Sequence, residues 1–543
     1  MRGRIQNYLR NHNINPRVGL GYAALVVLFV WTLAQFHIPG KGLSYLIAFG
    51  ANQESARLSK VRKLDYYVAR GSDGYDAQYY VQIAMDPSLQ NRELRHALDS
   101  LPYRARRILF SATAFVLGLG RPEWILHAFA LQNVLSWFLL AGLLLHWFPP
   151  RSWDNFVRWA GIMFSFGVCV SFRNALFDGP SLLLVAFGVY LLEKGRLWAA
   201  TAVLALSGLG KETNLLGAAA LAPKIPGDGR AWGLAVVRGL LTVVPLALWM
   251  LYIASTVGGQ AGDLGVRNFD LPFAAYMRKW HEIADGWGDI SVVSAGPLWS
   301  LLMMVVLTVQ FLYLVLRPQW SRAWWRIGLS FALLMIFLGD AVWEGYPGAA
   351  SRVLLPMQLA FNILVPTGRA WWLVLVLGNL TLLVAPAALE SPTGEGYVIK
   401  GRGELVYGRA GGKVTIDFSD TWYPVERHNN DYWCWSAGDA ALTLHNPHPV
   451  SLRARLRFLL TVNERRSVRL RVNGADVWAT ELGSSGTVNV VLGEVVLQPG
   501  DNAIDFSTDA PPSRIGNDPR LLAFRVQNLR LDLQQQLPVA PPE

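Results

Sequence analysis

The sequence is poor in charge and in cysteine for a chain of 543 residues. Charged residues make up 16% of it, against about a quarter in ordinary soluble domains, whereas 52% of its residues are hydrophobic. Its two cysteines, Cys169 in an apolar run and Cys434 near the C-terminus, are poorly placed for a mutual disulfide and too few for a metal site. The cysteines therefore point neither to a disulfide-stapled protein nor to a cysteine-based metal site, and we expect both to be structural.

Long apolar runs occupy the chain from residue 18 to about residue 389. A helix needs about 20 mostly apolar residues to cross the hydrocarbon core of a bilayer. Runs that reach or approach this length predict about eleven transmembrane helices, the first being a retained anchor rather than a cleaved signal peptide. The shorter stretch 106–120 is expected to dip into the membrane face. The predicted spans are 18–38, 124–147, 155–172, 179–193, 196–209, 212–223, 231–256, 296–316, 326–342, 353–367 and 370–389.

The positions of arginine and lysine predict the orientation of these spans, because cytoplasmic connections are enriched in both. With the N-terminus in the cytoplasm, every predicted inner connection carries a cation, and 39–123, 257–295 and 390–543 lie outside. None of these three segments contains an Asn-x-Ser/Thr site, which favours a bacterial inner membrane and its periplasm. The net charge of +11 is largely explained by these anchors and the terminal domain, so nucleic-acid binding is not expected. The inner cations are Arg2, Arg4, Arg10, Arg17, Arg151, Lys194, Arg196, Lys224, Arg230, Arg317, Arg322, Arg326 and Arg369.

From residue 390 onward the sequence changes to short alternating runs separated by turn residues. The turns are marked by Asn446-Pro447, Asn473-Gly474 and Pro499-Gly500. This pattern predicts an all-β sandwich or jelly-roll domain at 390–543, after a multi-spanning membrane domain at 1–389. An aromatic cluster near its start suits either core packing or a stacking platform for sugar rings. The predicted strands are 413–418, 441–444, 452–460, 467–472, 487–492 and 521–533, and the cluster is Trp422, Tyr423, Tyr432, Trp433 and Trp435.

Charged residues at membrane depth are costly and mark candidate functional sites. In the first outer loop, Asp73 and Gly74 suit a turn, and Asp76 suits either the N-cap of a helix or a catalytic acid. Lys211 and Arg352 are notable because they break the inside-positive trend. Together these groups predict a polar cavity at the outer membrane face. The further outer-face residues are Arg104, Arg106 and Arg107 after Tyr103, then Arg173, Asn174 and Asp178, then Glu212, Thr213 and Asn214, and finally Glu344.

The run Asp76-Ala77-Gln78-Tyr79-Tyr80 resembles a known motif. Many bacterial members of the glycosyltransferase-C superfamily carry a similar Asp-Gly-Gln-Phe/Tyr-Tyr pattern in a long first outer loop, where this chain has Ala77 in place of glycine. The stretch 104–109 also looks like the segment that follows this loop in the family. The resemblance covers the membrane part of the chain, and it implies an enzyme that takes a sugar from a polyprenyl-phosphate carrier.

The resemblance also implies roles for residues. Asp76 would be the general base that activates an acceptor hydroxyl on a glycan or lipid-linked acceptor, with inversion at the sugar. Asp73, Glu212 and Glu344 would be reserves for that role, and His281 and Glu282 would either contact the acceptor or form a solvated loop face. The phosphate-binding cations would be Arg104, Arg107, Lys211 and Arg352, and the substrate-binding residues Gln78, Tyr79, Tyr80, Glu212 and Glu344.

No second acidic pair stands out as a metal site, because Asp73 and Asp76 alone offer too few oxygen ligands. We therefore expect no cofactor and metal-independent chemistry, with a divalent metal as the open alternative. Two other functional classes stay open. A transporter or flippase of lipid-linked sugars would also carry charges at membrane depth, although no internal repeat is visible here. A non-catalytic protein of envelope glycan assembly would tolerate the loss of Asp76.

Overall fold

In the computed structural model the chain folds into two compact units. The helical unit comprises Met1–Phe36, Ala56–Leu64 and Tyr75–Ser391, and the β unit comprises His37–Ser55, Asp65–Gly74 and Pro392–Glu543. Of the predicted inner cations, Arg2, Arg4 and Arg10 lie outside the described residues. The structure describes residues 15–38, 41–69, 72–258, 265–286, 296–345, 347–390, 397–400, 414–428, 431–447, 449, 451–515 and 518–537.

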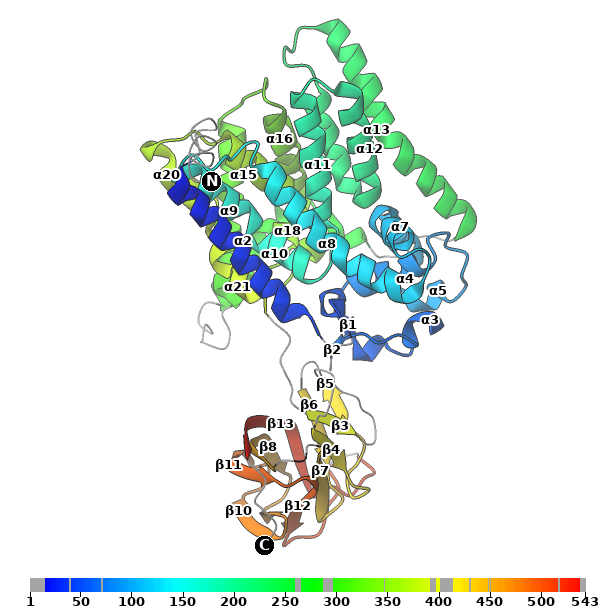
Figure 1. Cartoon of the computed structure of the whole chain (residues 1–543), viewed down its shortest axis with the longest axis vertical. Coiled ribbons are helices and arrows are strands. Elements are labelled where there is room, and N and C mark those ends of the chain that lie inside the picture. Colours follow the sequence, from blue (N-terminus) through cyan, green and yellow to red (C-terminus); the bar gives the residue numbers. More distant parts are fainter. Residues whose placement is uncertain are drawn as a thin grey trace, which may run out of the picture. The chain divides into compact units, whose positions relative to one another are not determined.

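The helical unit is built from long helices interspersed with short ones (Figure 1). Polar residues before the helices set several of its boundaries. Asp228 caps the longest helix by accepting a hydrogen bond from the backbone of Ala231, 3.0 Å away, and Ser165 separates α9 from α10 by capping the latter. The helices are α2 (Pro16–Phe36), α3 (Ser59–Arg62), α4 (Ala77–Met85), α5 (Leu94–Ala97), α6 (Leu101–Arg104), α7 (Ile108–Leu117), α8 (Pro122–Leu144), α9 (Trp153–Met163), α10 (Phe166–Arg173), α11 (Asp178–Glu193), α12 (Leu197–Gly210), η3 (Glu212–Leu221), α13 (Gly229–Thr256), η4 (Val266–Asn268), α14 (Ala274–Asp285), α15 (Gly296–Leu316), α16 (Ala323–Phe337), α17 (Asp340–Trp343), α18 (Ala350–Val353), α19 (Leu355–Leu364), η6 (Arg369–Trp371), α20 (Trp372–Leu377), η7 (Leu380–Val384) and α21 (Ala385–Ala388).

Fewer helices are long and apolar enough to span a membrane than the sequence predicts. Among the described residues four qualify, α2, α8, α13 and α15, or up to six if the bent pairs α9–α10 and 369–388 each form one span. The predicted spans at 179–193, 196–209, 212–223, 326–342 and 353–367 become short helices instead. The 14 residues of α12 reach only about 21 Å, less than the hydrocarbon thickness of about 30 Å. The prediction of about eleven spans is therefore not confirmed.

The outward faces of the longest helices are apolar, as expected of a membrane protein. Only 17% of the most apolar window of α13 is buried within the protein, and the same holds for α2. Leu240, Leu248 and Leu251 of α13 are more than half exposed. Such a continuous apolar surface would be unfavourable in water and suits contact with lipid. The chain is thus a membrane protein whose helical unit has lipid-facing sides.

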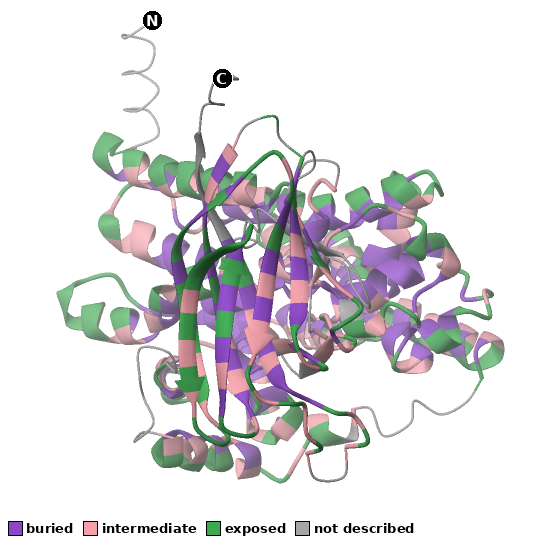
Figure 2. Ribbon diagram, turned by 90° about the horizontal axis from the view of Figure 1, so that it is seen from below, coloured by how far each residue is buried: buried purple, intermediate pink, exposed green. Residues whose placement is uncertain are grey.

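The β unit contains a sandwich of two sheets whose inner faces form its core. Burial alternates along the strands, as β8 and Figure 2 show, because successive side chains of a strand point to opposite faces. Among the described strands of the two sandwich sheets, pairing is antiparallel except between β3 and β4. One sheet has the order β10-β9-β12-β7-β4-β3 and the other β11-β8-β13-β6-β5. The strands are β3 (Tyr397–Lys400), β4 (Val414–Phe418), β5 (Glu426–His428), β6 (Asp431–Trp435), β7 (Ala440–Asn446), β8 (Ser451–Val462), β9 (Arg466–Val472), β10 (Ala475–Leu482), β11 (Thr487–Leu497), β12 (Gly500–Thr508) and β13 (Phe524–Leu537).

Two pieces of the predicted first outer loop belong to the β unit rather than to the helical one. They contain the short parallel pair β1 (Phe49–Gly50) and β2 (Val68–Ala69). Tyr67, just before β2, packs against the sandwich core. The loop between α2 and α4 therefore contributes residues to both units, a division that the boundary drawn at 389/390 does not include.

Candidate functional site

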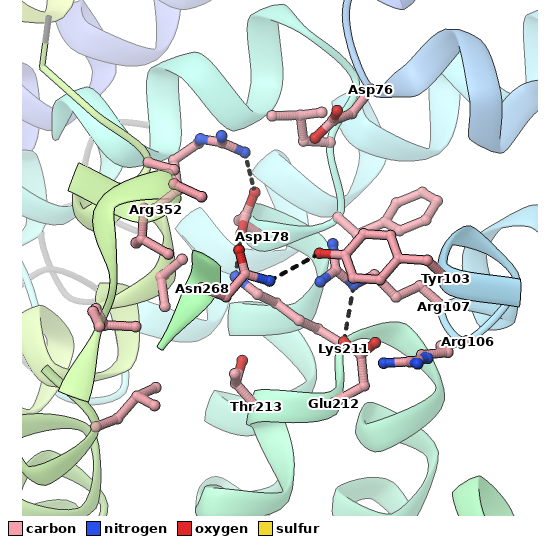
Figure 3. A pocket seen from close by; sticks show the side chains of 18 of the residues that line it. Asp76, Tyr103, Arg106, Arg107, Asp178, Lys211, Glu212, Thr213, Asn268 and Arg352 are labelled. Atoms are coloured by element: carbon pink, nitrogen blue, oxygen red, sulfur yellow. Dashed lines mark hydrogen bonds and ion pairs between the residues drawn. The ribbon is translucent and has the colours of Figure 1, made fainter. Parts of the chain in front are cut away.

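A cavity of about 310 Å³ in the helical unit gathers charged residues from five parts of the chain (Figure 3). They come from the start of α4, the α6–α7 connection, the start of α11, the junction of α12 with η3, and α18, and η4 adds the uncharged Asn268. Apolar side chains, among them Phe269, Leu334 and Leu338, complete the lining. The cavity therefore offers both polar and apolar surface to a ligand. Its polar lining residues are Asp76, Tyr80, Tyr103, Arg106, Arg107, Asp178, Lys211, Glu212, Thr213, Asn268 and Arg352.

Local backbone breaks place several of these side chains. Gly210 ends α12 where a Cβ atom would lie 2.8 Å from the ring of Phe110, and Lys211 then adopts an extended conformation. The chain restarts as η3, so Lys211 and Glu212 stand at the break between two helical segments. Asp178 similarly occupies the first position of α11. Charged groups thus reach the cavity from helix ends, where polar groups are easier to accommodate than along an apolar face.

Asp178 is the buried centre of the cationic side. Its carboxylate accepts a hydrogen bond from Lys211 and lies 3.1 Å from Nη1 of Arg352, and only 8% of the side chain is exposed. Arg352 also donates to the hydroxyl of Tyr75, 3.1 Å away. Burial raises the pKa of Asp178, but Lys211 and Arg352 lower it more, so its pKa lies below the usual range. Asp178 is therefore ionised and fixes the positions of both cations.

Asp76 lies at the edge of the cavity, with 36% of its side chain exposed. It occupies the N-cap position of α4, yet its side chain makes no capping hydrogen bond. Instead, its Oδ1 lies 3.0 Å from Nη1 of Arg104. Arg104 also donates to Asp99 at 2.6 Å and lies over the ring of Tyr79. The capping alternative for Asp76 therefore lacks its hydrogen bond, and Arg104 orients the carboxylate.

Two further arginines line the cavity and differ in their partners. Arg107 pairs with Glu212 at 2.9 Å and donates to the hydroxyl of Tyr80 at 3.0 Å. Among the described residues Arg106 makes no ion pair; its guanidinium lies over the ring of Tyr103, and its buried Nε has no hydrogen-bond partner. The buried hydroxyl of Thr213 is likewise without a partner in the described structure. A cation without an ion pair in the described structure and unsatisfied donors in one cavity suit an anionic ligand.

Comparisons with known proteins leave the family open. No protein-family model matches the chain, and no curated protein matches its sequence. Among solved structures, arabinosyltransferase EmbB from Mycobacterium smegmatis aligns with 96% of this chain and 65% of its own, at 11% identity and a TM-score of 0.30. The GH26-CBM35 beta-(1,4)-mannanase of Podospora anserina aligns with 24% of this chain and 27% of its own, at 13% identity and a TM-score of 0.15. This chain thus spans less than two thirds of either protein, and both scores are too low to establish a shared fold.

The remaining predicted site residues lie away from the cavity lining. Gln78 is buried within α4, and Tyr79 packs beside Arg104. Asp73 belongs to the β unit, where it accepts a hydrogen bond from Asn52 at 3.1 Å. Glu344 is exposed and pairs with Arg267.

The predicted acceptor contacts are also outside the lining. His281 and Glu282 are neighbours on α14, and Glu282 pairs with Lys279 at 2.9 Å. No cluster of three or more potential metal-ligating side chains occurs in the part of the chain that the structure describes. Metal-independent chemistry stays a prediction.

Sequence reasoning named Asp178, Arg106 and Thr213 without giving them a role, and it did not single out Asn268. Asn268 donates to the hydroxyl of Tyr103 at 3.2 Å. A signal for Asp178 was present, because two cations next to apolar runs require a counter-charge when they are buried. Nothing in the local sequence around Asn268 marks it as part of a site.

Proposed function

We propose that the chain is a membrane glycosyltransferase that moves a sugar from a polyprenyl-phosphate carrier to a hydroxyl of a glycan or lipid-linked acceptor. The observation that carries this proposal is the cavity that combines the carboxylate of Asp76 with four cations and apolar lining residues. A lipid-linked donor has matching parts: a sugar, a phosphate and an apolar chain. In the orientation that we propose, the reaction takes place at the periplasmic face of the inner membrane.

In the proposed reaction Asp76 is the general base. It accepts the proton of the acceptor hydroxyl while that oxygen forms a bond to the anomeric carbon of the sugar. The bond from this carbon to the phosphate oxygen breaks, and the polyprenyl phosphate leaves with the electron pair. Attack from the face opposite the leaving group inverts the configuration. Arg104 has the role of holding Asp76 in the orientation needed for proton transfer.

The cations stabilise the charge that develops on the departing phosphate. Arg106 is the best-placed of them, because its guanidinium makes no ion pair among the described residues and Glu212, which acts on it electrostatically, pairs with Arg107. Lys211 and Arg352 share the single charge of Asp178, so this trio keeps one net positive charge. Arg107 is neutralised by Glu212 and is better suited to positioning Tyr80 and Glu212.

The apolar lining suits the first part of the polyprenyl chain. Leu334 of α16, Leu338 just after that helix and Val342 of α17 line the cavity together with the arginines of the α6–α7 connection. An isoprenoid chain placed against these side chains would leave water, which favours binding of the donor over that of a free sugar phosphate.

The test is a transfer assay with the purified full-length protein and a panel of radiolabelled polyprenyl-phosphate sugars, with a membrane glycan extract as acceptor. The proposal predicts label in the glycan together with release of polyprenyl phosphate. The same donors are then placed on one side of proteoliposomes that contain the protein. Movement of intact donor across the bilayer without transfer in the first assay would overturn the proposal in favour of a transporter.

A further inference from the structure

A second, larger cavity lies in the helical unit at the far ends of the elements that line the first. It has a volume of about 780 Å³ and is lined by Glu193 at the end of α11, Leu197 at the start of α12 and Ala323 at the start of α16. The candidate active site contacts the opposite ends, at Asp178, Lys211 and Leu338. From Asp178 to Glu193 the helix α11 rises by about 22 Å, so the two cavities are well separated.

This second cavity is strongly basic. Lys224, Arg238, Arg322 and Arg326 line it, from the η3–α13 connection, α13 and the start of α16, and among its described lining residues Glu193 is the one acidic residue. Glu193 already accepts a hydrogen bond from Trp147 at 3.1 Å and lies 3.1 Å from Nε2 of His146. None of the four cations makes an ion pair within the described residues. The excess of positive charge in one cavity would be repulsive unless an anion occupied it.

Arg238 places one of these cations within a helix that is long and apolar enough to span the membrane. It lies on the membrane-spanning helix α13, about 13 Å along the axis from the first residue. Its guanidinium lies over the ring of Trp198 at 5.3 Å, and its buried Nε has no hydrogen-bond partner in the described structure. A charged side chain inside a span is costly and is retained where it meets a partner.

The other cations and the apolar lining complete the site. Arg326 is buried and donates to the backbone oxygens of Ala219, Ala220 and Trp320, so its bonds are satisfied while its charge is not compensated. Leu234 and Ile363 add apolar surface. The volume is typical of sites for organic ligands and exceeds the needs of a bare phosphate.

We propose that this cavity binds the phosphate headgroup of an anionic membrane lipid, with Arg238 and Arg322 as its direct ligands. Basic pockets between membrane helices are suited to such headgroups, and the apolar lining accommodates the start of an acyl chain. The bound phosphate joins α13 to the α15–α16 connection by neutralising cations from both. The site does not depend on the proposed transferase activity.

The test measures the thermal midpoint of the full-length protein in a non-ionic detergent during titration with phosphatidylglycerol. The expected result is a rise in the midpoint with phosphatidylglycerol but not with phosphatidylcholine or inorganic phosphate. Arg238→Gln and Arg322→Gln should each raise the lipid concentration for half of this rise about tenfold. The control Arg230→Gln removes the same charge from an exposed position of α13 outside the cavity and should leave the titration unchanged.

Three outcomes would overturn the proposal. Equal shifts with phosphatidylcholine would make the effect unspecific, and equal shifts with inorganic phosphate would assign the site to a free anion. An unchanged titration for the cavity variants would place the lipid elsewhere. If Arg238→Gln does not fold, Arg322→Gln decides the question, because Arg322 is exposed and its substitution disturbs little packing.

Discussion

Nη1 of Arg104 lies 3.0 Å from Oδ1 of Asp76, while its Nη2 lies 2.6 Å from Oδ2 of Asp99. Arg104 thus connects the candidate base to a second carboxylate through one rigid guanidinium plane. The Arg104 side chain is 9% exposed, so the surrounding protein restricts its motion. In the proposed enzyme this contact decides where the proton acceptor stands relative to the acceptor hydroxyl.

The first prediction concerns this positioning. Arg104→Lys keeps a positive charge but loses the fork that engages both carboxylates, so Asp76 is no longer held in one orientation. We expect kcat to fall about 10²-fold with little change in KM for the donor, because a misplaced base affects the chemical step. Steady-state kinetics with a labelled polyprenyl-phosphate sugar measures kcat and KM separately. Asp99→Asn, which keeps a hydrogen-bond acceptor for Arg104, should have a much smaller effect; a rise in KM alone for Arg104→Lys would contradict the positioning role.

A second prediction separates the two arginines of the α6–α7 connection. Arg106→Gln should reduce transfer by about 10²- to 10³-fold, because it removes a donor to the leaving phosphate. It should cost no more than about 1 kcal/mol of stability, since its main contact in the described structure is the ring of Tyr103. Activity and thermal unfolding are measured on the same preparation.

Arg107→Gln is the matched variant and should destabilise the protein more. It leaves the half-buried Glu212 without its ion-pair partner, at a cost of about 1–3 kcal/mol. The account would fail if Arg106→Gln transferred sugar at the wild-type rate while Arg107→Gln lost activity with unchanged stability.

The third prediction is a pH dependence that comes from Asp178. Its pKa in the folded protein lies below its usual range, because Lys211 and Arg352 outweigh the effect of burial. Ionised Asp178 therefore stabilises the folded state above its unfolded pKa of about 4, and this contribution is lost as the pH falls through the lower folded pKa. Asp178→Asn should cost about 3–5 kcal/mol at neutral pH, because two buried cations lose their partner.

This pH dependence is tested by measuring the free energy of unfolding of wild type and of Asp178→Asn in detergent, from pH 7 downward. The stability difference should stay constant down to about pH 4 and shrink below it. A difference that grew on acidification would show that Asp178 is protonated in the folded protein.

A fourth prediction concerns the β unit. Trp422 is 2% exposed and packs against Phe506 and Phe524 in the sandwich core, so it contributes to stability and not to a sugar platform. Trp422→Ala should destabilise the β unit by about 3–5 kcal/mol. Limited proteolysis of the full-length protein measures this loss. Trp433→Ala removes a half-buried ring and should have a smaller effect; equal protease resistance of Trp422→Ala and wild type would contradict the core assignment.

The strands of the sandwich could be predicted because their signals are local. Alternating side chains and turn residues occur within a few positions of each other, and Asn473 and Gly474 both adopt positive φ angles in the β9–β10 hairpin. The predicted strand at 413–418 corresponds to β4, and that at 467–472 to β9. The contact of Tyr67 with the sandwich core could not be predicted. Tyr67 is more than 300 positions before the core residues in the sequence, and no local pattern marks it as part of that core.

The limits of the membrane helices and the pairing within the site could not be predicted from the spacing of residues in the sequence. Apolar composition alone does not show where a helix breaks, as at Gly210 and Lys211 between α12 and η3. The sequence indicated that Lys211 and Arg352 lie at one membrane face. It did not show that both meet Asp178, which is 174 positions from Arg352. Pairing over such distances depends on how the helices pack.

The most direct test of the central claim is the rate of sugar transfer by Asp76→Asn beside Asp73→Asn. Both variants make the same chemical change three residues apart, but Asp76 lines the cavity and Asp73 belongs to the β unit. The account predicts that Asp76→Asn folds and loses about 10²- to 10⁴-fold in transfer rate, as expected for loss of a general base, whereas Asp73→Asn stays close to wild type. Transfer at the wild-type rate by folded Asp76→Asn would contradict it.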